Sequence, residues 1–524
     1  MIVSEKHKRL VVRSRHPERV KAVLPHAKEA QFRGTDVIVL PHTLDDVKIL
    51  SNLGMQAPSP IKYYYDWPRS HSIPNPFAAQ CTTAAFLTLW NRAYVLNGLG
   101  TGKTLASLWA FDYLRSIGKA NRLLVISPLS TVDLTWGDTI FEHFTHLDFA
   151  ILHGTRKKRF DLLKQNFDVY ITNHDGAKIL ASALADRKDI SHVIIDEVSQ
   201  CARNAQTDRW KALNTIVNKQ CGGTRACWGM TATPTPNEPT DAWAQARLIT
   251  PETVPKYHTR FKDMVMRQAG PYLWVPRKNS TDIVHKALSP SIRFSREECV
   301  DLPPTTYQNR TVLLTAEQKN MYKDMEGKLR AEIENGEVTA VNEAVKALKL
   351  VQIACGVVYD SKGEHYVVDN DYRLKEVLSV VQESQTKSIV FVPFVSAVVH
   401  VAEYLRNKGF KVGVIHGGVS GKARHEIFLG FQNGSTVDVL VAQPRAMSHG
   451  LTLTAASTIV WFAPVTSSET YEQANGRVTR PGQKFNTLIV NIAGTKLEER
   501  MFKRLRTRQK MQNILLRMVE QNVA

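Results

Sequence analysis

The hydrophobic positions of the chain fall into two sets of short apolar runs, separated by longer stretches with helical spacing. Bare apolar strands that alternate with helices are typical of a parallel sheet covered on both faces. The pattern therefore predicts an α/β chain with two parallel-sheet domains in tandem. The runs of the two sets are residues 92–97, 123–128, 168–173, 192–197 and 225–233, then 388–394, 411–416, 438–443, 458–464 and 487–494.

The stretches outside these sets show other patterns. Residues 316–336 and 341–356 repeat apolar positions at helical spacing, and a basic amphipathic helix is expected from Leu497 to Met518. The region between the two sheets is therefore expected to be a mainly helical insertion. The predicted domains are residues 1–70, 71–250, 251–370, 371–496 and 497–524.

The first 70 residues predict a small α+β module. Apolar residues alternate in 35–41, which indicates a strand, and Thr43 is a suitable N-cap for a helix that ends near Gly54. The aromatic residues of 63–67 follow in a stretch that is rich in proline. They would either stack on a bound base or pack the module onto the next domain, and packing is the favoured interpretation.

Composition narrows the classes of partner. The 524 residues contain 68 Lys and Arg against 49 Asp and Glu, a net charge of +19, which favours a polyanionic partner such as nucleic acid. The six cysteines are scattered without a CxxC pair, so no zinc ribbon or disulfide framework is expected. No apolar run is long enough for a membrane span, and the start lacks a secretory pattern. A reducing, cytoplasmic compartment is expected.

A glycine-rich loop stands between an apolar run and a helical stretch, in the sequence NGLGTGKT (97–104). Glycines in this position let backbone N–H groups turn towards phosphates at the start of a helix. Lys103 would reach the β- and γ-phosphates and Thr104 would ligate Mg²⁺. Asn97 stands where such loops usually begin with glycine. The expected nucleotide-binding residues here are Gly98, Gly100, Thr101, Gly102, Lys103 and Thr104.

Two carboxylates end the apolar run 192–197 in the sequence HVIIDEVS. Asp196 is suited to hold Mg²⁺ through water, and Glu197 to polarise an attacking water molecule. Together with the glycine-rich loop, this pair predicts ATP hydrolysis.

Several motifs occur in the order found in superfamily 2 helicases. They are NPFAAQ, GTGKT, DEVS, MTATPTPN (230–237) and QANGRVTRPGQ (473–483). The last motif, the stretch TPTPNEPTDAWAQARLITP and the segment GLTLTAAS closely resemble the Swi/Snf-like branch of that superfamily. The resemblance covers roughly residues 72–515, and it implies two RecA-like domains with a helical insertion.

The resemblance also implies roles for residues outside the glycine-rich loop. Phe77 and Gln80 would contact the adenine, and Gln473 would belong to the nucleotide site. Arg477 and Arg480 would stabilise charge on the transferring phosphoryl group, and their spacing on a presumed helix would place them on one face. The expected contacts to the DNA backbone are Ser130, Thr172, Asn173, His174, Ser448, His449, Gly450 and Thr452.

Two departures from the family pattern point to a compact, divergent member of bacterial or phage type. One is the sequence DEVS at the two carboxylates, and the other is the stretch PVTSSETYEQ that leads into the last motif. The expected function is ATP- and Mg²⁺-dependent translocation on duplex or branched DNA in replication, recombination or repair, by a monomer. A strand-separating fork or RNA helicase is the first alternative. A nucleic-acid-binding scaffold with an inactive nucleotide site is the second. Beside the motor, residues 1–70 would form a possible DNA-recognition domain or else a plain packing domain.

Overall fold

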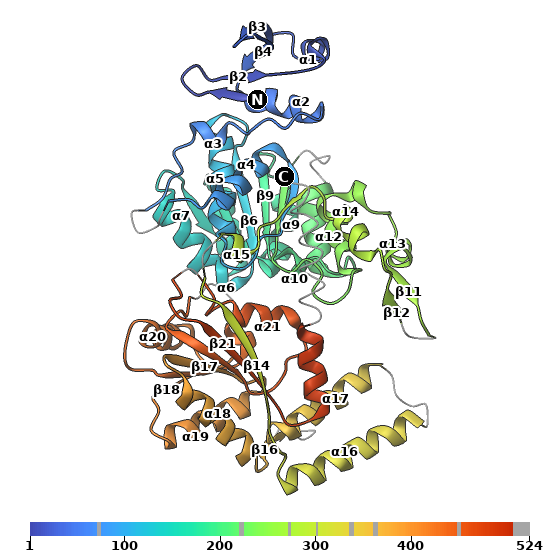
Figure 1. The fold of residues 1–524 in the computed structure, drawn as a ribbon, viewed down its shortest axis with the longest axis vertical. Helices are drawn as coiled ribbons and strands as arrows, with labels where there is room; N and C mark the ends of the chain where they lie inside the picture. The colour runs from blue at the N-terminus through green and yellow to red at the C-terminus, as the bar shows by residue number, and fades with distance from the viewer. Residues whose placement is uncertain are drawn as a thin grey trace. The chain divides into compact units, whose positions relative to one another are not determined.

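The computed structural model describes residues 1–70, 75–219, 225–270, 274–299, 302–334, 340–359, 365–447, 452–480 and 482–506. The chain divides into two compact units between Cys299 and Val300, and each unit contains its own parallel sheet (Figure 1). This boundary divides the predicted insertion 251–370: residues up to 299 belong to the first unit and the following residues belong to the second. Among the described residues, no helix is long and apolar enough to cross a membrane.

The N-terminal module is an antiparallel sheet with two helices at the start of the first unit. Its strands have the order β1-β2-β4-β3, and its core includes Leu10, Leu40 and Val47. The predicted strand and helix are confirmed, and the Thr43 side chain accepts from the backbone N–H of Asp46 as an N-cap. The elements are β1 (Ile2–Ser4), β2 (Arg9–Val12), α1 (Pro17–Val23), β3 (Lys28–Phe32), β4 (Thr35–Pro41) and α2 (Leu44–Asn52).

The sheet of the first unit has seven parallel strands in the order β13-β5-β10-β9-β6-β8-β7. Leu124 and Ile126 pack into one hydrophobic cluster, while Leu123 and Val125 pack into another, so both faces of the sheet are covered. The strands are β5 (Arg92–Val95), β6 (Arg122–Ser127), β7 (Phe149–Ile151), β8 (Val169–Asn173), β9 (Ile190–Asp196), β10 (Ala226–Met230) and β13 (Ser291–Ile292).

Helices and a hairpin complete the first unit. A π-helical turn at Val132–Gly137 interrupts the connection after β6. The hairpin of β11 (Met266–Gln268) and β12 (Trp274–Pro276) was not predicted from the sequence. The helices are α3 (Ile61–Tyr64), α4 (Ala78–Leu89), α5 (Lys103–Ser116), α6 (Leu129–Thr131), α7 (Asp138–His143), α8 (Arg156–Lys164), α9 (His174–Asp186), α10 (Val198–Cys201), α11 (Asp208–Asn214), α12 (Asp241–Ile249), α13 (His258–Val265), α14 (Ser280–Ala287) and α15 (Arg296–Cys299).

The aromatic residues of 63–67 attach the N-terminal module to α5. The Tyr64 hydroxyl is 3.0 Å from Nδ1 of His42, and the Tyr65 hydroxyl donates to Asp112 on α5 at 2.6 Å. The Trp67 ring stands edge-on to Trp109 with centroids 5.3 Å apart. The structure therefore shows the packing role that the sequence favoured.

The sheet of the second unit has six parallel strands in the order β14-β21-β20-β17-β19-β18. The expectation that the sequence between the two predicted sheets is mainly helical is wrong for β14, which lies at the sheet edge with mostly exposed residues. The strands are β14 (Thr305–Thr311), β17 (Lys387–Phe391), β18 (Val412–Ile415), β19 (Val439–Ala442), β20 (Ala456–Trp461) and β21 (Thr487–Ala493).

The predicted helices of the second unit are present. A separate hairpin pairs β15 (Val357–Tyr359) with β16 (His365–Val367). The C-terminal helix is described over 496–506, and the rest of its predicted length lies outside the described residues. The other helices are α16 (Ala316–Glu334), α17 (Ala340–Ala354), α18 (Asp371–Glu383), α19 (Val395–Asn407), α20 (Gly421–Gln432) and α21 (Ser468–Asn475).

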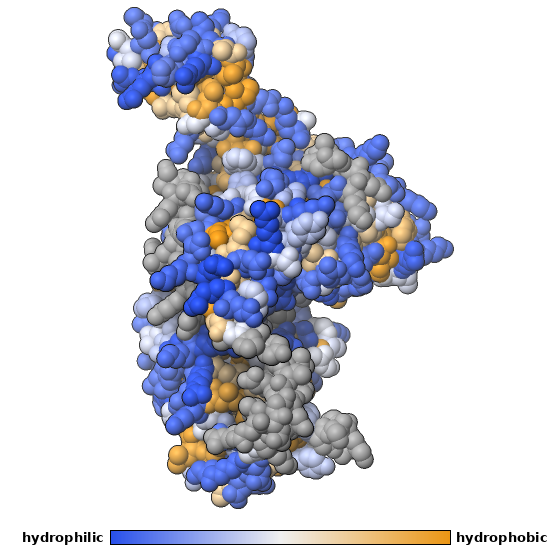
Figure 2. All heavy atoms as spheres, turned by 90° about the vertical axis from the view of Figure 1, so that its right-hand side faces the viewer, coloured by the Kyte–Doolittle hydropathy of each residue, from blue (hydrophilic) through white to orange (hydrophobic). Residues whose placement is uncertain are grey.

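A buried ion pair joins α18 to the C-terminal helix. Arg373 lies 2.8 Å from Glu498, and both side chains are almost fully buried. The guanidinium also contacts the carbonyl and the ring of Phe462. Removing one partner of a buried ion pair is strongly destabilising, because the other charge is left uncompensated. The face of the molecule drawn in Figure 2 is mainly hydrophilic, with several separate hydrophobic patches.

Candidate functional site

The carboxyl ends of three neighbouring strands meet at one edge of the first sheet. In the pairing register, Met230 at the end of β10 is opposite Val95 of β5 on one side and Asp196 of β9 on the other. The glycine-rich loop follows β5, and Thr231 follows β10. Open parallel sheets bind ligands outside such carboxyl ends.

The glycine-rich loop has the conformation that its sequence predicts. Gly100 and Gly102 have φ angles of 77° and 75°, a left-handed region that favours glycine. A Cβ on Gly102 would also lie 1.9 Å from Nε2 of Gln80. A side chain at this position would therefore have to displace the Gln80 carboxamide. The loop leads directly into α5, whose first residue is Lys103.

Lys103 points back into its own loop. Its Nζ donates to the carbonyl oxygens of Asn97 and Gly98, at 3.0 and 3.1 Å. The Thr101 hydroxyl donates to the same Gly98 oxygen at 2.9 Å. The ammonium group is therefore held beside the loop that would receive a phosphate. Thr104, next in the chain, is half-buried.

Asp196 is buried, and two residues distant in sequence hydrogen-bond to it. Its Oδ2 accepts from the Trp136 indole at 3.1 Å, and its backbone oxygen lies 2.9 Å from Nε2 of His174. Burial raises the pKa of the carboxyl, whereas the Trp136 hydrogen bond and the Lys103 charge oppose that rise. Burial lowers the pKa of His174 to about 4, so its imidazole is neutral near pH 7 and donates from Nε2.

Glu197 follows Asp196 in a left-handed backbone conformation, with φ 49° and ψ 51°. This conformation is uncommon for a residue with a side chain. The Thr231 hydroxyl donates to Glu197 Oε2 at 3.4 Å and lies 2.9 Å from the Ser199 hydroxyl. The backbone N–H of Thr233 also donates to Thr231. Thr231 thus connects the carboxylate to the segment that follows β10.

The residues present fit Mg²⁺ bound together with a nucleotide. Within the described residues, no group of three or more His, Cys, Asp or Glu is arranged for a metal ion. Mg²⁺ is usually bound by one or two protein oxygens plus substrate phosphates. The Thr104 hydroxyl and the Asp196 carboxylate are the predicted ligands, and a cation beside Asp196 would keep this buried carboxylate ionised.

The predicted adenine contacts begin α4. Gln80 Oε1 accepts from the backbone N–H of Phe77 at 2.9 Å, and its Nε2 lies against Gly102. Gln80 is buried and Phe77 is half-buried. The amide therefore also supports the loop, and its contact to adenine stays a prediction.

The predicted DNA contacts differ in their exposure. Ser130 and Thr452 are exposed and Asn173 is half-buried at the start of α9, whereas Thr172 and His174 are buried. The burial does not favour direct phosphate contacts for Thr172 and His174; His174 instead supports Asp196. Three further predicted residues lie outside the described ranges, namely Ser448, His449 and Gly450.

The last motif is largely integrated into the fold of the second unit. Helix α21 ends at Asn475, so Arg477 and Arg480 lie in the turn after it, and the presumed shared helical face is wrong. Arg477 is buried, and Nε of the half-buried Arg480 donates to the carbonyl of Gly476. Gln473 is buried and donates to Glu469 at 3.3 Å.

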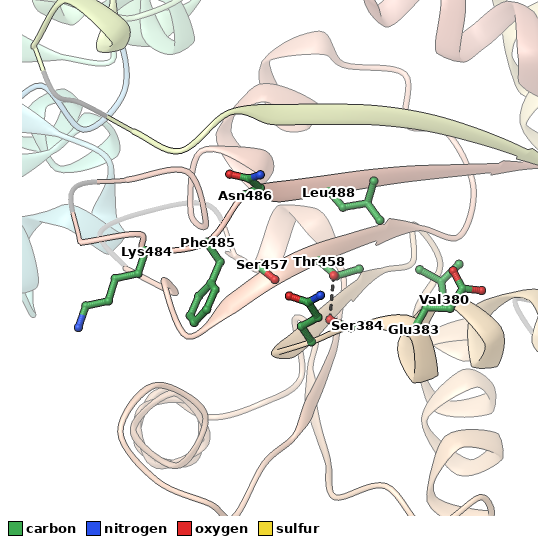
Figure 3. A pocket seen from close by; sticks show the side chains of 10 residues that line it. Val380, Glu383, Ser384, Ser457, Thr458, Lys484, Phe485, Asn486 and Leu488 are labelled. Atoms are coloured by element: carbon green, nitrogen blue, oxygen red, sulfur yellow. Dashed lines mark hydrogen bonds between the residues drawn. The ribbon is translucent and has the colours of Figure 1, made fainter.

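Gln483, which ends this motif, joins three parts of the second unit. Its Nε2 donates to the carbonyls of Ala456 and Val478, and its Oε1 accepts from the N–H groups of Lys484 and Phe485. Lys484 and Phe485 then line a pocket of about 440 Å³ (Figure 3). None of the predicted site residues lines this pocket, and its Ser384 and Thr458 hydroxyls bond to each other at 2.8 Å.

Sequence reasoning missed Trp136, Thr231 and Asn97 as parts of the site. Thr231 belongs to a recognised motif, MTATPTPN, which was a usable signal. Trp136 had none, because it acts on a carboxylate 60 positions further along the chain. Its π-helical turn is a feature often found at functional sites, but one that a sequence does not reveal.

Comparison with known proteins assigns the family. The SNF2-related domain model matches residues 94–356, and the helicase conserved C-terminal domain model matches residues 372–482. Protein p41 of Acyrthosiphon pisum secondary endosymbiont phage 1 is 26% identical over 448 residues, which cover 81% of this chain and 94% of p41. An uncharacterized ATP-dependent helicase of Mycoplasma pneumoniae is 23% identical, over 77% of this chain but only 38% of its own length.

A solved structure is also similar. The Sulfolobus solfataricus SWI2/SNF2 ATPase core in complex with dsDNA is 22% identical, with a TM-score of 0.42, over 84% of this chain and 93% of that one. The SNF2-related model alone spans half of the chain, and the helicase C-terminal model follows it in the second unit. The chain therefore belongs to the SNF2-related family of nucleic-acid-dependent ATPases.

Proposed function

We propose that the chain hydrolyses ATP at the carboxyl edge of the first sheet and uses the energy to translocate on duplex DNA. The observation that carries this proposal is the assembly around Asp196. Lys103, Trp136 and His174 come from three separate segments. The Trp136 indole donates to the Asp196 carboxylate, the Lys103 charge lowers the pKa of that carboxyl, and the His174 imidazole donates to the Asp196 backbone carbonyl. Such convergence of charged and polar groups at a sheet edge is typical of a catalytic site.

The loop and Asp196 would bind the nucleotide. Backbone N–H groups of the loop and the start of α5 favour negative phosphate charge. Lys103 would leave the carbonyls of Asn97 and Gly98 and place its ammonium on the β- and γ-phosphates. Bound Mg²⁺, held by Thr104 and Asp196, would neutralise negative charge on the phosphates.

Glu197 would polarise the attacking water molecule. Its carboxylate is buried at the same edge of the sheet as the glycine-rich loop, and the Thr231 hydroxyl limits its orientation. A positioned carboxylate of this kind accepts the proton that water loses during attack. Arg477 and Arg480 stay predicted as the cations that stabilise charge in the transition state.

DNA is the proposed track because charge and surface chemistry both favour it. The net charge of +19 favours phosphate binding, and Ser130 and Thr452 present exposed hydroxyls. One similar solved structure, the Sulfolobus core, is described as a complex with dsDNA. We therefore place the activity in DNA remodelling during replication, recombination or repair, with strand separation at forks or on RNA as the alternative.

Steady-state ATP hydrolysis tests this proposal directly. The rate is measured without nucleic acid and then with duplex DNA, single-stranded DNA, forked DNA and RNA. All reactions use one salt concentration, because phosphate binding depends strongly on salt. Lys103→Ala is the control, and its loss of the phosphate-bound cation should reduce turnover at least about a thousandfold.

The outcomes separate the candidates. Stimulation by duplex or forked DNA supports the translocase. Stimulation only by single strands or RNA supports a strand-separating helicase instead. Hydrolysis by Lys103→Ala at the wild-type rate would show that the proposed site is not the source of turnover.

A further inference from the structure

The segment before Cys299 runs beside the glycine-rich loop. Strand β13 pairs with β5 in parallel, and the backbone N–H groups of Tyr94 and Leu96 donate to the carbonyls of Pro290 and Ile292. The same ladder continues into the loop, where the Gly98 N–H donates to the Phe294 carbonyl at 2.9 Å. The loop that would bind phosphate is therefore bonded to residues 290–294.

The Asn97 side chain completes this connection. Its Oδ1 accepts from the backbone N–H of Phe294 at 3.0 Å, and its Nδ2 donates to the Thr83 hydroxyl of α4 at 2.9 Å. Thr83 in turn donates to the Ala79 carbonyl at 2.7 Å. Asn97 is only 2% exposed, so both ends of its carboxamide are satisfied inside the protein. Glycine would offer neither bond, and aspartate would lose the donor.

The same peptide groups hold Lys103. Its Nζ donates to the carbonyls of Asn97 and Gly98. Both of these residues also bond to Phe294, Asn97 through its side chain and Gly98 through its backbone N–H. The fit is close, because a Cβ on Gly98 would lie 3.1 Å from the backbone nitrogen of Arg296. A movement of Lys103 onto a phosphate therefore changes the bonding of the two residues that contact this segment.

We propose that Asn97 is a positioning residue that couples nucleotide binding at the loop to the segment 290–299, which continues along the chain into the second unit. The coupling rests on the proposed function, since it presumes that a nucleotide phosphate draws Lys103 from these carbonyls. Asn97 thereby transmits the state of the loop to the chain that joins the two units. Through Thr83, it also fixes the start of the loop to the helix that carries Gln80.

Four variants of the full chain test the coupling. Asn97→Ala removes both side-chain bonds, and Asn97→Asp keeps the acceptor for Phe294 but loses the donor to Thr83. Thr83→Val removes the acceptor for the Asn97 amide, together with the Thr83 bond to Ala79 within α4, and leaves the Phe294 bond in place. Asn218→Ala is the matched control, because Asn218 also uses both ends of a partly buried amide. It accepts from Arg92 at the end of β5 opposite the loop, and it donates to Leu248 and Asn214. Melting temperatures identify variants that fail to fold.

Two measurements are made on each variant. The first is the ratio of DNA-stimulated to basal ATP hydrolysis, with KM and kcat separated. The second is hydrogen exchange of the peptide containing residues 290–299, with and without a non-hydrolysable ATP analogue. Wild type should show nucleotide-dependent protection of this peptide. Asn97→Ala should lose that dependence and reduce the stimulation ratio about tenfold, the equivalent of one hydrogen bond to a buried partner.

The variants give a graded expectation. Asn97→Asp should retain most of the exchange difference at Phe294, Thr83→Val should be intermediate, and Asn218→Ala should match wild type in both readouts. The inference is overturned if Asn97→Ala keeps the wild-type stimulation ratio and the wild-type exchange difference. If wild type itself neither hydrolyses ATP nor responds to the analogue, the proposed function has failed instead.

Discussion

The two parallel sheets use the polar residues of their motifs in different ways. In the first unit, Asp196 and Glu197 are held by groups such as Trp136 and Thr231 that leave the carboxylates at a strand end, beside the glycine-rich loop. In the second unit, Gln473 donates to Glu469 of its own helix. Gln483 bonds to Ala456 of β20, to Val478 and to the two residues that follow it. Motif residues of the first sheet are thus placed for the proposed chemistry, whereas these two glutamines of the second unit support its fold.

The largest expected effect tests whether the motif QANGRVTRPGQ of the second unit has any chemical role. Arg480→Ala should reduce nucleic-acid-stimulated ATP hydrolysis about a thousandfold, because an arginine that stabilises transition-state charge has an effect of this size. Nucleotide binding, measured by a fluorescent ATP analogue, should be retained. Normal hydrolysis by this variant would leave the second unit's motif with a folding role alone.

Glu197→Gln tests the first unit in the same way. The amide cannot accept the proton from water, so turnover should fall about a thousandfold while ATP still binds. Because Thr231 donates to Oε2, the neutral side chain can keep the same position. A binding assay beside a single-turnover rate measures both quantities, and loss of binding would contradict a purely chemical role.

Gln483→Ala should give the opposite result. It removes four hydrogen bonds inside the second unit, so the free energy of unfolding should fall by about 3 kcal/mol. Denaturant titration measures this change. Hydrolysis per folded molecule should stay within about twofold of wild type, by the same reasoning that assigns Gln483 a folding role. A stable variant without hydrolysis would reverse the comparison.

Trp136→Phe should have the smallest effect. Phenylalanine fills most of the buried space but removes the indole donor, which lowers the pKa of Asp196. The pKa should therefore rise further, and the acid side of the pH–rate profile should move to higher pH. Near neutral pH, kcat/KM should fall about tenfold, the value of one hydrogen bond to a charged group. An unshifted profile would contradict the assigned contact.

Much of both sheets could be predicted, because their strands are continuous apolar runs that are buried on both faces. Strand β14 could not, since TTYQNRT is polar and lies exposed at a sheet edge, where only backbone pairing defines it. Strand β7 is only three residues long. The end of α21 at Asn475 was also not predicted. Arg477 and Arg480 are three positions apart, as they would be on one face of a helix, but residues 476–480 form turns and bends.

The site was predicted to the extent that its residues stand in one motif. GKT and DE indicated Lys103 and Asp196 as candidates from local sequence alone. The supporting partners are distant along the chain: Phe294 bonds to Asn97 across 197 positions, and Thr231 to Glu197 across 34. Most buried polar groups have such a partner, but the sequence does not say which one it will be.

The aromatic attachment at α5 sets a limit on how the chain can be shortened. The family match begins at residue 94, yet Tyr65 bonds to Asp112, and the Trp109 indole donates to the carbonyl of Pro68. A fragment that starts at 75 would leave Trp109 and Asp112 uncovered on the helix that begins with Lys103. An expression fragment without the N-terminal sheet should therefore still include residues from about 57, where the chain enters this aromatic stretch.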